Sequence, residues 1–467
     1  MKSSTNRNVY EFASTWLDRN RSTLIRSALI ISVLSASLFF APRVALGNRY
    51  PTLLALALFG AVSFGIALRW PTLGLIAGLV GGAVVPFTWQ GGFNVSQIIL
   101  AAMLGVWFLD MLVIRKNFQL VRSSTMLPVL AFVSVSILSF CLGQFSWYPF
   151  ARNAPIEAQL GGLAISLLSA GAFLLVAHFV TDQRKLEILT WSFLLLGSVY
   201  VLGRFMYLGW IDRLYHLGFT AGSLFWTWLA ALLAGQVVGN RHLRSGLRLL
   251  LGAMLFLTFY VAVVQAFDWK SGWFPPLVGI TVVFTLRYWS RVRFFELLAA
   301  IPLYLLVSAS VGQEDWSWAT RLDAWLIVLN IAKVSPILGM GFANYYWYTP
   351  LFPIRGYAVV FNSHSQFVDL IAETGVLGLA CFVWIFAAVG LLGLKLAKTA
   401  PDGFALGYVY GALGGLAGTL VAAYLVDWVL PFVYNIGMNG FRASILAWLF
   451  MGGLVSIEQI VRRKITV

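Results

Sequence analysis

The chain has 467 residues, of which 60% are hydrophobic and only 10% are charged, and its formal net charge is +15. Soluble globular domains carry about 45–50% apolar and roughly 25% charged residues, so this composition excludes a soluble enzyme, a disordered chain and a disulfide scaffold. The apolar runs are continuous rather than alternating, which excludes an outer-membrane barrel. We therefore predict an all-α, polytopic membrane protein, because a helix satisfies all its backbone hydrogen bonds within the lipid.

Fourteen apolar runs are long enough to cross the hydrocarbon core, which takes about 20 helical residues. They fall at 24–41, 51–68, 71–89, 95–114, 125–143, 160–181, 186–209, 217–238, 247–267, 273–289, 294–311, 366–394, 403–426 and 440–457. Only two residues, Arg69 and Trp70, separate the second run from the third, so one or two runs can be re-entrant. The expectation is about 12–14 transmembrane helices.

The distribution of basic residues predicts the orientation of these spans. With the N-terminus in the cytoplasm, 22 of the 32 Lys and Arg residues fall on the cytoplasmic side, as the positive-inside rule requires. The positive charge thus sets topology, and no nucleic-acid partner is expected. The predicted organisation has five parts: a cytoplasmic segment 1–23, a helical bundle 24–311, a large external loop 312–365, C-terminal spans 366–457 and a basic cytoplasmic tail 458–467.

The large external loop has internal structure of its own. A helical pattern runs from about Ala319 to Val334, Pro336 ends it, and Gly339 and Gly341 indicate a turn. An aromatic stretch with two prolines follows at 345–353. Long loops in compact proteins are usually functional.

Four basic residues lie on the predicted external side, each near a helix end: Arg213, Lys270, Arg321 and His364. Together they would form a pocket for a dianion such as pyrophosphate. The alternative is that each arginine or lysine pairs with its acidic neighbour, as Arg213 with Asp212 or Arg321 with Asp323. For His364 the alternative is a helix cap or another satisfied polar residue.

Two carboxylates, Asp369 and Glu373, are four residues apart and share one face of the span that follows His364. A carboxylate within a membrane span is a functional candidate. The competing interpretation is that both are structural partners of basic residues on neighbouring helices. The cysteines, Cys141 and Cys381, lie in apolar surroundings, and no pattern typical of a metal site or a disulfide is present.

The loop and the following span resemble one family of membrane glycosyltransferases. The relevant residues are Arg321–Trp325, Pro336, Gly339–Phe342, Asn362–Ser365 and Glu373–Leu379. Their order and spacing are similar to the Arg-x-x-x-Trp, Pro-x-x-Gly-x-Gly, His-Asn and Glu-x-Gly-x-x-Gly motifs of the O-antigen ligase and polymerase superfamily. Arg213 resembles the family's earlier external arginine. The chain departs from the pattern at Ser365, where the family has Asn, and at Lys270, which stands near the place of an arginine.

The resemblance implies a glycosyltransferase of the bacterial inner membrane with an external active site. The donor would be a glycan on undecaprenyl pyrophosphate, and the acceptor a glycan or a lipid-linked sugar. Relatives work without a metal or another cofactor and with inversion. Arg213, Lys270 and Arg321 would stabilise the leaving pyrophosphate, and His364 would deprotonate or orient the acceptor hydroxyl.

The resemblance also suggests supporting roles for four further residues. Asp369 or Glu373 would orient the imidazole, and Tyr345 and Trp347 would stack on sugar rings or anchor the loop at the membrane interface. The motifs do not separate a ligase from a polymerase of repeat units. Two competing hypotheses remain open, namely a polysaccharide flippase or transporter and a relative that glycosylates proteins.

Overall fold

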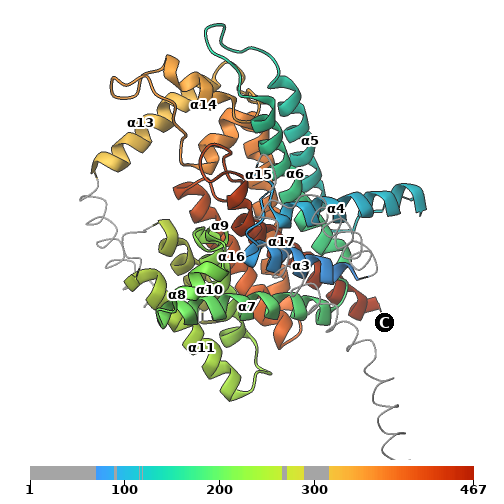
Figure 1. Cartoon of the computed structure of the whole chain (residues 1–467). Coiled ribbons are helices and arrows are strands. Elements are labelled where there is room, and N and C mark those ends of the chain that lie inside the picture. The colour runs from blue at the N-terminus through green and yellow to red at the C-terminus, as the bar shows by residue number, and fades with distance from the viewer. Residues whose placement is uncertain are drawn as a thin grey trace, which may run out of the picture.

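The computed structural model describes residues 70–88, 92–114, 116–117, 119–265, 271–288 and 315–466. Lys270, the segment 1–23 and the predicted spans 24–41, 51–68 and 294–311 lie outside the described residues. The other eleven predicted spans coincide with helices (Figure 1). Among the described residues, seven helices are long and apolar enough to cross a membrane, and three shorter apolar ones accompany them. The described residues contain two isolated bridges and no strand, so the predicted all-α polytopic architecture is confirmed.

The described helices are as follows, in chain order: α3 (Pro71–Val84), α4 (Val95–Leu109) with a π-helical extension (Asp110–Ile114), α5 (Met126–Leu142), α6 (Ile156–Phe179), α7 (Gln183–Phe205), α8 (Gly209–Leu214), α9 (Leu217–Thr220), α10 (Ser223–Gly239), α11 (Ser245–Phe259) with a π-helical extension (Tyr260–Gln265), the helical residues 271–288, α13 (Asp315–Ala332), α14 (Asn344–Tyr348), a 3₁₀ turn (Thr349–Leu351), α15 (Gln366–Thr399), α16 (Phe404–Leu425) and α17 (Gly437–Thr466).

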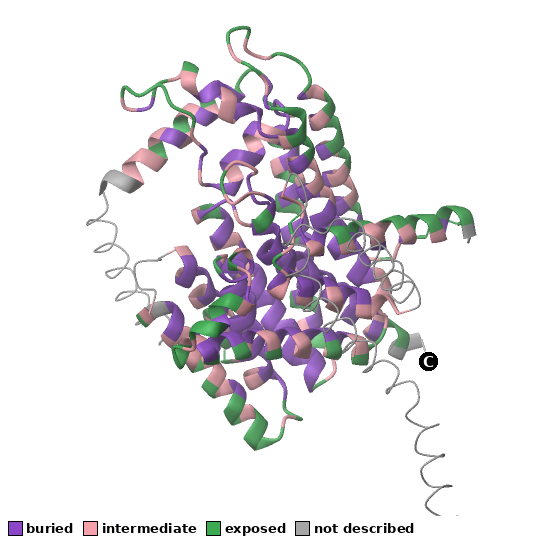
Figure 2. Ribbon diagram, viewed as in Figure 1, coloured by how far each residue is buried: buried purple, intermediate pink, exposed green. Residues whose placement is uncertain are grey.

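The core of the molecule is formed by α10, α16 and α17, which are apolar on all sides and buried along most of their length (Figure 2). Small residues allow α10 and α16 to approach closely. A Cβ atom on Gly235 would lie 2.3 Å from the carbonyl oxygen of Gly407. Such small-residue interfaces are typical of membrane helices, where van der Waals packing replaces the hydrophobic effect.

Large apolar side chains cover the outer helices. Leu112, Leu249 and Phe256 are more than 60% exposed on the π-helical extension of α4 and on α11. In a soluble protein such surfaces would aggregate. In a polytopic protein they face the lipid.

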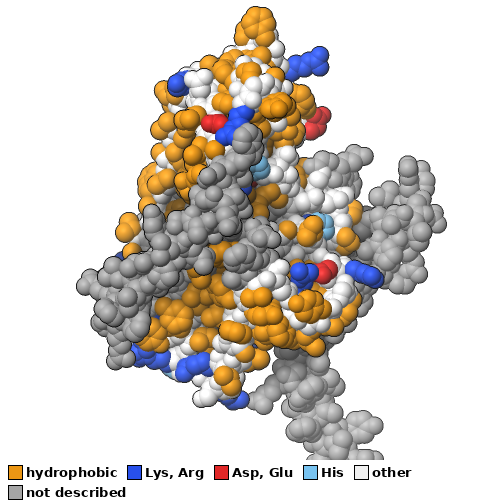
Figure 3. All heavy atoms as spheres, turned by 90° about the vertical axis from the view of Figure 1, so that its left-hand side faces the viewer, with side chains coloured by type: hydrophobic (Ala, Val, Ile, Leu, Met, Phe, Trp, Pro, Cys, Tyr) orange, Lys and Arg blue, Asp and Glu red, His pale blue; other side chains and the backbone are white. Residues whose placement is uncertain are grey.

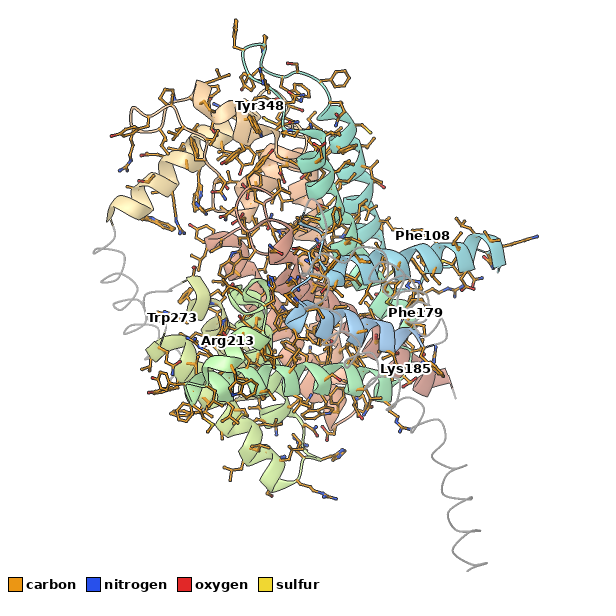
Figure 4. All side chains as sticks on the ribbon, viewed as in Figure 1. Phe108, Phe179, Lys185, Arg213, Trp273 and Tyr348 are labelled. Carbon is orange, nitrogen blue, oxygen red and sulfur yellow. The ribbon has the colours of Figure 1, made fainter. Side chains whose placement is uncertain are left out.

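Segments predicted on the same side of the membrane contact one another. Arg462 donates to the Arg122 carbonyl (2.9 Å), and Arg241 pairs with Asp402 (3.3 Å). On the other side, the His216 backbone N–H donates to the Ala83 carbonyl (2.7 Å). In Figure 4, α7 connects these sides, running from Lys185 towards the region of Arg213. These contacts join segments that the alternation places on the same side, and the topology itself stays a prediction.

The loop predicted to be external contains more helix than its sequence predicts. α13 begins before Ala319 and ends near the predicted position, ahead of Pro336. Gly339 and Gly341 have φ values of 71° and 85°, as expected for a turn. The aromatic stretch forms α14 and a 3₁₀ turn. Pro350 lies within the 3₁₀ turn and Pro353 lies beyond it, so neither proline interrupts α14.

Candidate active site

Arg321 lies in the second turn of α13 and is half-buried. Its Nη1 donates to the carbonyl of Leu425, 3.1 Å away, at the carboxyl end of α16. Asp323 does not pair with Arg321, because it accepts a hydrogen bond from Arg355 Nε at 2.8 Å. Within the described part of the chain, the guanidinium has no carboxylate partner, and its Nη2 and Nε groups make no hydrogen bond. Arg321 therefore retains donors and a positive charge for an anionic ligand.

Arg213 shows the same pattern on α8. The neighbouring Asp212 pairs with Arg204 at 3.0 Å, and Arg213 is exposed with no ion pair among the described residues. Figure 4 places Arg213 on the same side of the molecule as α13 but well below it, apart from Tyr348. Figure 3 views this side, where the few charged side chains stand among hydrophobic ones. The structure thus brings Arg321 and His364 together but leaves Arg213 in a different part of the same face.

His364 lies just before α15 with a backbone φ of 51°, in the left-handed region. A non-glycine residue there stores strain, and such residues cluster at functional sites. The indole N–H of Trp325 donates to the carbonyl of Ser363 at 2.7 Å and so holds this segment against α13. Burial and the nearby positive charge of Arg321 lower the pKa of His364 below its usual 6.5. At neutral pH the imidazole is therefore uncharged.

Two residues near His364, Asn435 and Asp427, were not predicted from the sequence. Asn435 Nδ2 lies 3.5 Å from His364 Nδ1, at the upper limit for a hydrogen bond, and donates to Asp427 Oδ1 at 2.8 Å. Asn362 Nδ2 approaches the second oxygen of Asp427 at 3.5 Å. Asp427 is fully buried, and this burial raises its pKa to about 6. It directly follows the apolar run 403–426, where a carboxylate is typical of a membrane boundary, so its position in the sequence gives no sign of a functional role.

Asp369 does not orient the imidazole in this structure. It is buried, and its Oδ1 accepts hydrogen bonds from Tyr345 (2.5 Å) and Ser363 (2.6 Å). Tyr345 is itself fully buried and stacks on Phe432, with ring centroids 5.0 Å apart. These residues tie α14 to the start of α15, and Tyr345 has no open face for a sugar ring.

Trp347 is partly exposed, and its indole N–H donates to the hydroxyl of Tyr434 at 2.8 Å. Tyr434 also stacks on Tyr346, at 4.6 Å between ring centroids. Of the two aromatic residues expected to contact sugar, only Trp347 has ring surface open to a ligand.

Glu373 belongs to a backbone junction that explains the glycine motifs. Gly375, with φ 69° and ψ −173°, breaks the helical geometry of α15. The break frees the carbonyls of Ala372 and Glu373, which accept from the N–H groups of Met340 and Gly341 at 3.0 Å each. A Cβ atom on Gly375 would lie 2.2 Å from the carbonyl oxygen of Ile337. The Pro-x-x-Gly-x-Gly turn and the Glu-x-Gly segment are thus two halves of one junction.

The junction also contains hydrogen bonds in the other direction, donated by backbone N–H groups of α15 to carbonyls of the loop. Val376 and Leu377 donate to the carbonyls of Pro336 and Ile337, at 2.9 and 3.1 Å. The Glu373 side chain accepts from the Ala343 N–H at 2.8 Å. Neither Glu373 nor Asp369 pairs with a Lys or Arg of the described residues, so both act on the loop rather than as partners of basic residues on neighbouring helices.

A cavity of about 10 Å³ lies beside Glu373, lined also by Gln366, Ser166 and Phe342. A volume of this size holds about one water molecule. It is far too small for a sugar ring, and neither Arg321 nor His364 lines it. No group of three His, Cys, Asp or Glu side chains in the described ranges is arranged to hold a metal ion.

Comparison with known families agrees with the motifs. A family model described as O-antigen ligase matches residues 224–383, which include Arg321, His364 and the glycine junction. The match ends before Asp427 and Asn435 and begins after Arg213. A sequence search finds no match among curated proteins. The matched segment carries the family's motifs in a polytopic helical fold, which supports membership of the O-antigen ligase and polymerase superfamily.

Proposed function

We propose that the protein is an O-antigen-ligase-type glycosyltransferase. It transfers a glycan from undecaprenyl pyrophosphate to an acceptor sugar at the external face of the inner membrane. The acceptor hydroxyl oxygen bonds to the anomeric carbon as the bond from that carbon to the phosphate oxygen breaks. Undecaprenyl pyrophosphate leaves with the bonding electrons, and the reaction proceeds with inversion.

The observation that carries this proposal is the state of Arg321. Its neighbouring carboxylate is engaged by Arg355, and the guanidinium is held on one backbone carbonyl with further N–H groups unused within the described part of the chain. A preorganised guanidinium can bind two phosphate oxygens and stabilises the charge that develops on the leaving group. Arg213, equally free of its acidic neighbour, supplies a second positive charge on the same side.

The neutral imidazole of His364 lies beside this positive charge, at the point where the external loop enters the membrane-spanning α15. A pyrophosphate attached to a membrane lipid and a water-borne acceptor would meet at that level. His364 contacts the reacting oxygens there, either by taking the acceptor's proton or by donating a hydrogen bond. Lys270 would add a third cation if it replaces the family's arginine.

The test is reconstitution. Purified protein in liposomes receives a synthetic undecaprenyl-pyrophosphate glycan and a panel of acceptors: a lipid A core oligosaccharide, a second donor molecule and a serine-containing peptide. We expect one glycan to be transferred to the core oligosaccharide, with release of undecaprenyl pyrophosphate. Transfer should persist in EDTA because arginines supply the positive charge. Loss of activity in EDTA and its return with Mg²⁺ would contradict this mechanism.

The same experiment separates the competing functions. Growth of the donor glycan without a core acceptor would show a polymerase, and labelling of the peptide would show a protein glycosyltransferase. Movement of the intact donor across the bilayer, with no new glycosidic bond, would show a flippase and overturn the proposal.

A further inference from the structure

The side-chain amide of Asn435 lies between two groups of different chemistry. Its Nδ2 is 2.8 Å from Asp427 Oδ1 and 3.5 Å from His364 Nδ1. Asp427 is fully buried and its second oxygen faces the amide of Asn362. The carboxylate therefore accepts hydrogen bonds from two amide groups and contacts no Lys or Arg of the described residues.

The carboxylate fixes which end of the Asn435 amide faces it. If the amide were turned over, its carbonyl oxygen would face a carboxylate oxygen at 2.8 Å, and two acceptors would repel each other. The NH₂ group therefore faces Asp427, and the same NH₂ group faces His364. Nδ1 of His364 must then be the acceptor, and a neutral imidazole with an unprotonated Nδ1 carries its proton on Nε2.

The electrostatic surroundings favour both a neutral His364 imidazole and an Asn435 amide whose NH₂ group faces Asp427. The titratable and charged groups that face the network within the described residues are Arg321 on α13 and the carboxyl groups of Asp369 and Glu373 on α15. Arg321 and burial lower the pKa of His364, which keeps the ring neutral. Asp427, with a pKa of about 6, is ionised at neutral pH and keeps the amide in its donating orientation.

We infer that Asn435 is a positioning residue, held by Asp427, that locks His364 in the tautomer with the proton on Nε2. His364 then donates a hydrogen bond from Nε2 to an anionic oxygen of the substrate and does not act as the general base. This role rests on the proposed transferase function. The acceptor's proton passes to solvent water on the face of the sugar opposite the pyrophosphate, while undecaprenyl pyrophosphate leaves with the bonding electrons and accepts the hydrogen bond from His364 Nε2.

The tautomer can be measured without any activity. The chain has four histidines, and ¹³C,¹⁵N-histidine labelling with solid-state NMR in liposomes distinguishes protonated from unprotonated ring nitrogens. Two residues provide references. His178 Nε2 accepts from the Val121 N–H (3.2 Å), which places its proton on Nδ1, whereas His216 Nδ1 accepts from the Gly218 N–H (3.0 Å), which places its proton on Nε2.

At pH 7.5 we expect His364 to match the His216 pattern, with its signals assigned by their loss in the His364→Gln variant. In Asn435→Leu the unprotonated Nδ1 signal should move and the Nδ1–H form should become populated. A wild-type His364 with its proton on Nδ1, as in His178, would overturn the inference whether or not the protein is a transferase.

Activity then tests the role of the Nε2 proton. The terminal amide of Gln reaches the position of Nε2 and can donate, whereas Asn reaches only the position of Nδ1, and neither is a base. We expect His364→Gln to retain at least about tenfold more transfer than His364→Asn, within the roughly 10²–10⁴-fold range of such a group. Equal, complete loss in both variants would refute the donor role. Failure of the wild-type protein on every acceptor would instead refute the transferase function and leave the tautomer result standing.

Discussion

Arg355 Nε donates to Asp323 Oδ2 at 2.8 Å, and this ion pair leaves Arg321, two residues before Asp323, without a carboxylate partner in the described part of the chain. On α8 the pair between Arg204 and Asp212 has the same consequence for Arg213. Side chains one or two residues apart on a helix do not face each other. A carboxylate close in sequence to an arginine therefore need not form an ion pair with it. Two arginines that the sequence allowed to be neutralised are therefore available to an anion.

The first prediction concerns these arginines. Arg321→Ala and Arg213→Ala should each lower transfer roughly 10²–10³-fold, the cost of removing one preorganised donor. Arg321→Lys should recover only part of the loss because lysine lacks the planar fork. The control is Arg152→Ala, which removes an exposed arginine outside the proposed site and should leave transfer near the wild-type level. An equal loss of transfer in this control would mean that general positive charge, not these two sites, matters.

The second prediction concerns the strain at His364. Its φ of 51° suits glycine better than any residue with a Cβ atom. His364→Gly should therefore unfold at a higher temperature than His364→Ala, by about 1 kcal/mol in stability, while both variants are nearly inactive. Thermal unfolding in detergent and donor-binding assays on both variants give the comparison. If the alanine variant is as stable as the glycine variant, the backbone at this position is not strained.

The third prediction separates backbone strain from close packing at the glycine junction. Gly375→Ala places a Cβ atom 2.2 Å from the Ile337 carbonyl oxygen in addition to its positive φ, and should destabilise by more than about 2 kcal/mol. Gly356 also has a positive φ, 87°, but open space around its Cβ position, so Gly356→Ala should cost only about 1 kcal/mol. Thermal midpoints of the two variants, measured side by side, test this. If both variants lower the thermal midpoint equally, close packing at the junction between the loop and α15 does not contribute to stability.

The fourth prediction concerns pH. Asp427 has a pKa raised to about 6 and must be ionised to hold Asn435, so transfer should fall as the pH drops below about 6. His364, with its pKa lowered by burial and Arg321, gains a proton only below its usual range. The Asp427→Asn variant cannot be protonated at position 427. The fall in its transfer rate on acidification should therefore begin at a lower pH than in the wild type. An unchanged acid limb in this variant would assign it to another group.

The fifth prediction concerns topology. The segment 313–363 should be external and Arg241–Arg248 cytoplasmic. After replacement of Cys141 and Cys381 by alanine, single cysteines at the exposed positions Tyr357 and Arg244 should react with a membrane-impermeant maleimide from opposite sides. Labelling of both from the same side of intact cells would contradict the alternation of the spans.

The sequence by itself determined the architecture, since continuous apolar runs in lipid leave only helices, and eleven of the predicted spans coincide with helices of the structure. The motifs also singled out Arg321 and His364. The glycine motifs could be located because a turn that needs positive φ favours glycine wherever it occurs. The sequence did not determine the partners of the charged groups. Asp323 with Arg355 and Asp427 with Asn435 and His364 are contacts between segments far apart in the chain, or across a loop.

Only the tertiary structure therefore decided that Asp369 and the buried Tyr345 anchor the loop, that Arg213 and Arg321 keep their charge, and that Asn435 stands behind the histidine. The physical reason is that hydrophobic pattern and local geometry act over a few residues, whereas the state of an ionisable group is set by whatever the fold brings within a few ångströms of it.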